Sequence, residues 1–235
     1  MPISDRITKA SVLGLTLLLA GCGGAFNAAD PPAPAVTRVA GGQVQVAGPN
    51  GYCIDKAATR DRAGQAFVVL ARCDALGGGD QRPVAPALLT VAISELTPNS
   101  GLPAAPMMAS FAESAEGRAM FSGDGDPASI EILDTRVNGD IFLMQARDRS
   151  AQNTSLSPEH WRAVFGVKGH LVSARVNSFA KRPISSDTGF ETLNALATRI
   201  KADNAVSKME TISSDTEVET VTNVRRPGIF ARLFQ

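Results

Sequence analysis

HWRAVFGVKGHLVSARVN, residues 160–177, is the stretch that decides the fold. A turn at Lys168-Gly169 would make it an antiparallel hairpin, in which successive side chains alternate between the two faces. One face would be entirely apolar, with Trp161, Ala163, Phe165, Val167, Val172, Ala174 and Val176. The other would carry Arg162, Ser173, Arg175 and Asn177. We interpret the stretch as a β-hairpin with one buried face.

A helix is the competing interpretation of the first half of this stretch. Ser157-Pro158-Glu159 resembles a helix start, because proline is tolerated at the first helical position. Trp161, Val164 and Phe165 would then share one helical face, which Gly166 would end. We favour the hairpin because the residues after the turn alternate so regularly.

A second hairpin is predicted upstream, over Ser129–Asp148, with its turn at Asn138-Gly139. Asn-Gly readily supplies the two positive φ angles of a tight hairpin turn. The predicted register places Leu133, Val137, Phe142, Met144 and Ala146 on one face. It places Ile130, Ile132, Ile141 and Leu143 on the other, mixed with Asp134 and Arg136. Sheets wetted on one side alternate more cleanly than this, so we expect cover on both faces.

Helices are expected over Met107–Glu116 and Thr188–Asn204, the latter opened by a capping box of Thr188 and Glu191. Strand-like stretches precede them at 43–47, 52–54, 66–71 and 88–96, and 56–64 reads as a loop or short helix. The order predicts an α+β fold, an antiparallel sheet with helices packed on it. From about Val39 to Asn204 this element order resembles the PsbP-like family of photosystem extrinsic proteins, and the resemblance implies an α/β/α sandwich. That resemblance implies a binding or assembly-accessory role rather than an enzyme.

The amino-terminal segment has the features of an export signal. Arg6 and Lys9 precede the apolar run Ala10–Ala20, which is too short to cross the roughly 30 Å hydrocarbon core of a membrane. A basic start, a short apolar stretch and small residues at its end are typical of a secretory signal peptide. We therefore assign residues 1–21 to a signal peptide.

Leu19-Ala20-Gly21-Cys22 resembles the lipobox of bacterial lipoproteins. The resemblance implies that the Cys22 sulfur carries diacylglycerol, that the chain is cut before Cys22, and that the new terminus is acylated, for example with palmitate. Gly23 rather than Asp favours the outer membrane, facing the periplasm. Residues 22–38 would be the acylated cysteine with an Ala/Pro-rich tether, 39–204 a single domain, and 205–235 a Ser/Thr/Glu-rich tail.

Cys53 and Cys73 remain after Cys22 is assigned to lipid, out of three cysteines. An even pair in an exported protein predicts one disulfide, the alternative being two buried free thiols. The 23 basic and 23 acidic residues give zero formal net charge, which argues against a nucleic-acid partner.

No catalytic, metal or cofactor motif is found in the sequence. His160 and His170, the two histidines, would lie too far apart in the hairpin to share a metal, so we place them at the surface or rim. Asp124 and Asp126 lack the remaining positions of a calcium loop and are read as a polar turn.

The last eleven residues, RRPGIFARLFQ, could form a short helix beginning at Pro227. Such a helix would align four apolar side chains as a docking peptide for a partner, namely Ile229, Phe230, Leu233 and Phe234. The alternative is that the segment folds back onto its own domain or frays.

Two hypotheses about function follow. The first is a membrane-anchored envelope lipoprotein whose non-catalytic domain binds a protein or another envelope component. The second is a small-ligand-binding domain, or a hydrolase whose site is not recognisable from sequence. A pocket lined by converging acids and a histidine would favour the second.

Overall fold

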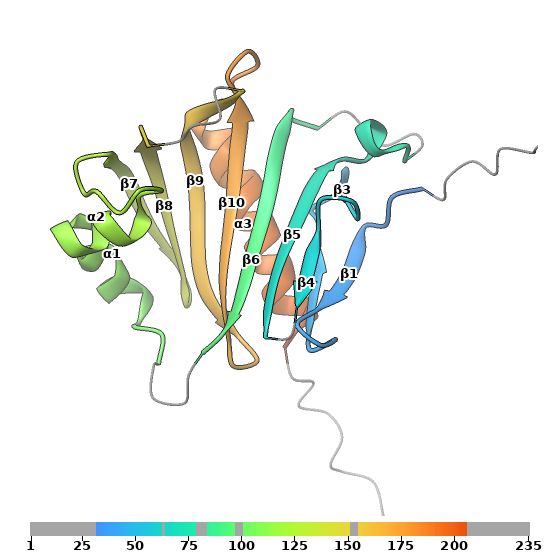
Figure 1. The fold of residues 1–235 in the computed structure, drawn as a ribbon, viewed down its shortest axis with the longest axis horizontal. Coiled ribbons are helices and arrows are strands. Elements are labelled where there is room, and N and C mark those ends of the chain that lie inside the picture. Colours follow the sequence, from blue (N-terminus) through green and yellow to red (C-terminus); the bar gives the residue numbers. More distant parts are fainter. Residues whose placement is uncertain (1–31, 63, 79–83, 97–100, 151–154, 206–235) are drawn as a thin grey trace, which may run out of the picture. The chain divides into compact units, whose positions relative to one another are not determined.

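An antiparallel sheet of eight strands forms the centre of the computed structural model, which describes residues 32–62, 64–78, 84–96, 101–150 and 155–205 (Figure 1). The strand order is β3-β5-β6-β10-β9-β8-β7, and β4 pairs with β5. The strands are β3 Tyr52–Ile54, β4 Arg60–Arg62, β5 Gln65–Arg72, β6 Ala87–Glu95, β7 Ile130–Asn138, β8 Ile141–Asp148, β9 Leu156–Val167 and β10 His170–Phe179. A separate ribbon pairs β1 Val36–Val39 with β2 Val44–Ala47.

The predicted hairpin at residues 160–177 is confirmed as β9 and β10. Lys168 and Gly169 both have positive φ, 46° and 76°, as a type I′ turn requires. All seven apolar residues predicted for one face are buried. The helical alternative is therefore wrong, because packing of this continuous apolar face outweighs the helix-start signal at Pro158.

Helices lie on both faces of the sheet, which confirms the α+β class and the cover inferred from the upstream hairpin. α3, Ser186–Asp203, lies on the face that we call the inner face (Figure 1). Its buried stripe of Leu193, Leu196, Ala197 and Ile200 joins the apolar face of β9 and β10 in one core cluster. α1, Ala105–Glu113, and α2, Ala115–Phe121, contact β7 and β8 on the opposite, outer face.

The upstream hairpin is confirmed as β7 and β8, with two differences in detail. Asn138 pairs with Ile141, so the turn is Gly139-Asp140 and of these only Gly139 has a positive φ. The register also shifts between Ile132 and Asp134, where Leu133 has no partner. One extra residue reverses the alternation. Ile130 and Ile132 therefore pack with Phe142, Met144 and Ala146 under α1 and α2, not with Ile141 and Leu143 as predicted.

The helix boundaries also differ from expectation. The helix expected over Met107–Glu116 is interrupted at Ser114, which ends α1 and caps α2 by accepting a hydrogen bond from the Gly117 amide. The capping box at Thr188 and Glu191 is wrong, because the cap of α3 lies three residues earlier than Thr188. Ser185 is its cap, and the Ser185 hydroxyl accepts the Thr188 amide.

The first half of the domain is held to the rest by covalent and polar links. The expected disulfide is present between Cys53 and Cys73, with a Cα–Cα distance of 4.8 Å, and joins β3 to the 3-10 turn Cys73–Leu76. Asn204, at the end of α3, binds both backbone groups of Gln45 in β2. The first strand, β1, begins at Val36. Among the described residues, no helix is long and apolar enough to span a membrane.

Candidate functional site

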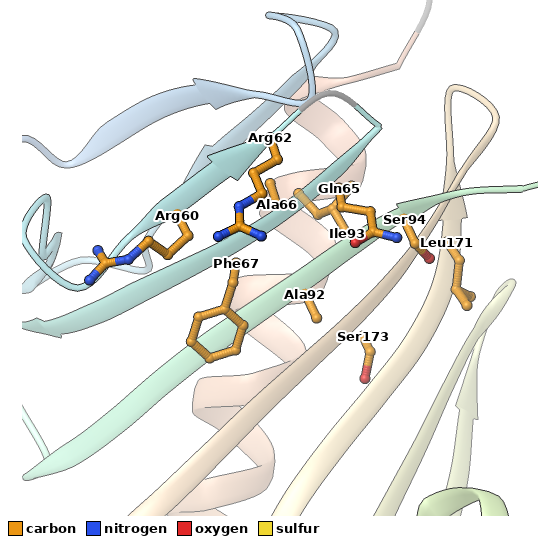
Figure 2. A pocket seen from close by; sticks show the side chains of 10 residues that line it. All are labelled: Arg60, Arg62, Gln65, Ala66, Phe67, Ala92, Ile93, Ser94, Leu171 and Ser173. Atoms are coloured by element: carbon orange, nitrogen blue, oxygen red, sulfur yellow. The ribbon is translucent and has the colours of Figure 1, made fainter.

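The outer face of the sheet divides into two regions. α1 and α2 pack over β7 and β8, and among the described residues the apolar cluster that they form there includes none from β4, β5 or β6. Over this second region lies a shallow hollow of about 450 Å³ (Figure 2). We call it the β4–β10 hollow, and it is lined by Arg60, Arg62, Gln65, Ala66, Phe67, Ala92, Ile93, Ser94, Leu171 and Ser173.

Strand register brings the lining residues into two rows across the sheet. In the first row Arg60 is opposite Phe67, Phe67 opposite Ala92, and Ala92 opposite Ser173. The Phe67 ring stands beside Ala92 in Figure 2, with the arginines on its β4 side. Side chains directly opposite each other in antiparallel strands have Cβ atoms about 5 Å apart, so each row forms a continuous surface.

A second row runs parallel to the first. Arg62 is opposite Gln65, Gln65 opposite Ser94, and Ser94 opposite Leu171. The two rows together surround an aromatic ring with polar side chains that can donate hydrogen bonds.

The β4–β10 hollow combines an exposed aromatic ring with positive charge. Phe67 is 42% exposed, although it lies in the middle of a sheet. Arg60 and Arg62 are exposed, and no acidic residue is among those that line the hollow. The Arg60 guanidinium donates to the carbonyl oxygens of Ala57 and Thr59, which holds it beside the strand. The surface therefore suits a partner that brings an apolar group and negative charge.

Sequence reasoning missed Arg60, Arg62 and Phe67 as a group. It read residues 56–64 as a loop or short helix, and the structure forms β4 there, in a hairpin with β5. The signal that could have found it is the alternation Arg60-Asp61-Arg62 followed by Gly64, which has a positive φ of 74°. Three residues are a short run for a strand, so the sequence does not predict that β4 pairs with β5. Without that pairing, the two arginines cannot be placed beside Phe67.

The two histidines lie on opposite faces and are both buried, at 6% exposure for His160 and 3% for His170, so their predicted surface position is wrong. His160 is seven residues along β9 from Val167, the partner of His170, or about 23 Å at 3.3 Å per residue. Burial, and then the nearby positive charge of Arg175, lower the pKa of His160 to about 4. Within the described ranges, no three His, Cys, Asp or Glu residues are arranged to hold a metal ion.

The other predicted sites divide into two groups. Asp124 and Asp126 form the polar turn expected of them, where each carboxylate accepts the backbone amide two residues ahead. These turn contacts lower the pKa of the Asp124 carboxyl, the Asp126 amide first and the Ser129 hydroxyl next. The lipidation site Cys22 lies outside the described residues. So do the four residues of the predicted docking peptide, Ile229, Phe230, Leu233 and Phe234.

Comparisons with known proteins yield only faint structural likenesses. No family model matches the chain, and no curated protein matches it significantly. The solution structure of cyanobacterial PsbP (CyanoP) from Synechocystis sp. PCC 6803 is similar at a TM-score of 0.39 and 17% sequence identity. The match covers 77% of this chain and 96% of that one.

Proposed function

We propose that this protein is a lipid-anchored lipoprotein of the cell envelope, and that its domain is a non-catalytic module that binds an acidic segment of another protein. The β4–β10 hollow would be the binding surface. The observation that carries this proposal is the pairing of exposed Phe67 with Arg60 and Arg62 on a face without acids among its lining residues.

The chemistry of the hollow favours a protein partner. Aromatic residues and arginine are enriched at the centres of protein interfaces, where they account for a large share of the binding energy. An arginine guanidinium binds a carboxylate through two parallel hydrogen bonds, so an acidic segment is complementary to this surface. The alternative of a hydrolase predicts converging acids and a histidine, and neither residue type lines the hollow. A smaller pocket is lined by His160 and by one acid, Glu159, whose carboxylate accepts hydrogen bonds from Arg147.

The anchor is proposed from the sequence Leu19-Ala20-Gly21-Cys22. Several acyl chains on one cysteine would hold the protein firmly, because a single chain binds membranes only marginally. We place the domain at the outer membrane, facing the periplasm. Cell fractionation tests this part: Cys22→Ser should leave the membrane fraction or keep its signal peptide. Full membrane retention of that variant at the normal mature mass would refute the anchor.

Site-specific crosslinking tests the binding surface. A photoreactive residue at position 67 should capture a partner in intact cells, and mass spectrometry should place the crosslink in an acidic segment. The same residue at position 107 is the matched control, because Met107 is 65% exposed but lies on α1. Reversing charge with Arg60→Glu and Arg62→Glu should reduce crosslinking at position 67 at least tenfold. Equal yields from positions 67 and 107, or no effect of charge reversal, would contradict the proposal.

A further inference from the structure

Two arginines face each other at the boundary between the helix-covered and uncovered regions of the outer face. Arg162 in β9 is directly paired with Arg175 in β10, and Arg175 is in turn opposite Thr90 in β6. Like charges directly opposite each other in a sheet are destabilising. The pair therefore needs a compensating interaction.

The protein supplies only part of that compensation. Arg162 is 6% exposed, and its guanidinium carbon lies 5.4 Å from the centroid of the Phe121 ring in α2. Its Nε is buried and has no hydrogen-bond partner. Burial lowers the pKa of Arg175, and in the described part of the chain neither guanidinium forms an ion pair or donates a hydrogen bond. A buried charge that lacks such partners is costly.

The surrounding charges leave the cluster positive. Asp148 is buried and is the acid whose field reaches both Arg175 and His160. Its oxygens already accept the amides of Gly123 and Ser150 and the Ser150 hydroxyl. His160, with its lowered pKa, is neutral at pH 7, and its Nε2 is a second buried nitrogen in this cluster without a partner. Two arginines and one carboxylate, which acts on Arg175, leave the cluster with one net positive charge.

We propose that Arg162 and Arg175 form a binding site for a small oxyanion, a phosphate or carboxylate group, that neutralises this charge. The planar guanidinium fork matches the oxygens of both groups, and two forks on adjacent strands suit a tetrahedral phosphate. Ser173, which lines the β4–β10 hollow, precedes Arg175 by two residues on the same strand face, so the proposed site is next to the hollow along β10. The site is distinct from Arg60 and Arg62 and does not depend on the proposed protein partner.

Titration of the purified full chain with sodium phosphate, and separately with sodium acetate, tests the site. The melting temperature in each salt is compared with that in sodium chloride at equal ionic strength, and calorimetry gives the dissociation constant. Phosphate should raise the melting temperature above that in chloride; a response to acetate alone would assign the site to carboxylates. Identical melting in all three salts, with no calorimetric binding, would overturn the proposal.

Two substitutions distinguish this site from the hollow. Arg175 is half-buried, and Arg175→Gln should weaken oxyanion binding at least tenfold. The melting temperature of this variant in chloride should stay the same or rise, because the like-charge contact is removed. Arg62→Gln is the control on the same face and should bind the oxyanion normally. Equal loss in both variants would show that binding reflects general surface charge and would refute the site. Should Arg175→Gln not fold, Arg162→Lys keeps the charge and should still lower affinity, because it removes the fork.

Discussion

Removing the Cys53–Cys73 disulfide should destabilise the domain by about 3 kcal/mol. The two cysteines are 20 residues apart in sequence. In the chain-entropy model, opening a loop of this length returns about 11 cal/mol/K to the unfolded chain, or roughly 3 kcal/mol at 25 °C. Both cysteines are buried, so reduced thiols stay in the core and gain little from solvent. The cost should therefore come almost entirely from the unfolded state.

Urea unfolding of the oxidised and reduced protein measures this cost. In thermal unfolding of a domain of this size, a loss of 1 kcal/mol lowers the melting temperature by about 2–4 °C, so the reduced protein should melt roughly 6–12 °C below the oxidised protein. Reduction of the unaltered chain is the main comparison, because it keeps both sulfur atoms in place. The Cys53→Ala/Cys73→Ala variant, which cannot form the disulfide, shows whether any disulfide survived in the reduced sample. A loss below about 1 kcal/mol, with thiols shown to be free, would refute the entropic argument.

Two further predictions concern packing and pH. A Cβ at Gly117 would lie 1.8 Å from the Phe111 carbonyl oxygen, so Gly117→Ala should cost about 2 kcal/mol or more in chemical unfolding, whereas Gly101→Ala, with open space, should be nearly neutral. His160 has its pKa lowered to about 4 from 6.5, so the unfolded chain binds the extra proton between these values and folding stability rises with pH across that window. The gain in folding stability across this window is on the order of 3 kcal/mol, and Arg175 and Asp148 are the charges that act on His160. The free energy of unfolding, measured from pH 4 to 7, should depend less on pH in His160→Gln than in the unaltered protein. The same pH dependence in both proteins would exclude His160 as the source.

The two long hairpins were predictable because burial fixes strand register. In β9 and β10 a shift of one residue would expose seven apolar side chains, so a single pairing is strongly favoured. Apolar residues on both faces of Ile130–Asp148 likewise required cover on both sides, which α3 on one face and α1 with α2 on the other provide.

The errors come from single residues whose effect depends on tertiary contacts. Leu133 is an ordinary strand residue in sequence, yet as the unpaired residue of a bulge it exchanges the faces of Ile130 and Ile132. Ser114 lies within an apparently continuous helical pattern. It becomes a cap because α2 turns against the end of α1, where Gly117 lets the backbones approach closely. Neither choice follows from local propensity alone.

The candidate oxyanion site was also only partly predictable from the sequence. The sequence already placed Arg162 and Arg175 on one face of a hairpin, together with Ser173 and Asn177. It could not indicate that α2 brings Phe121 over Arg162, or that Asp148 is occupied by the amides of Gly123 and Ser150. On a solvated sheet two opposing arginines are an unremarkable pair that water screens. Burial of Arg162 under α2 removes that screening, so the same two residues become a costly pair of like charges, and this is why we propose an oxyanion as the compensating partner.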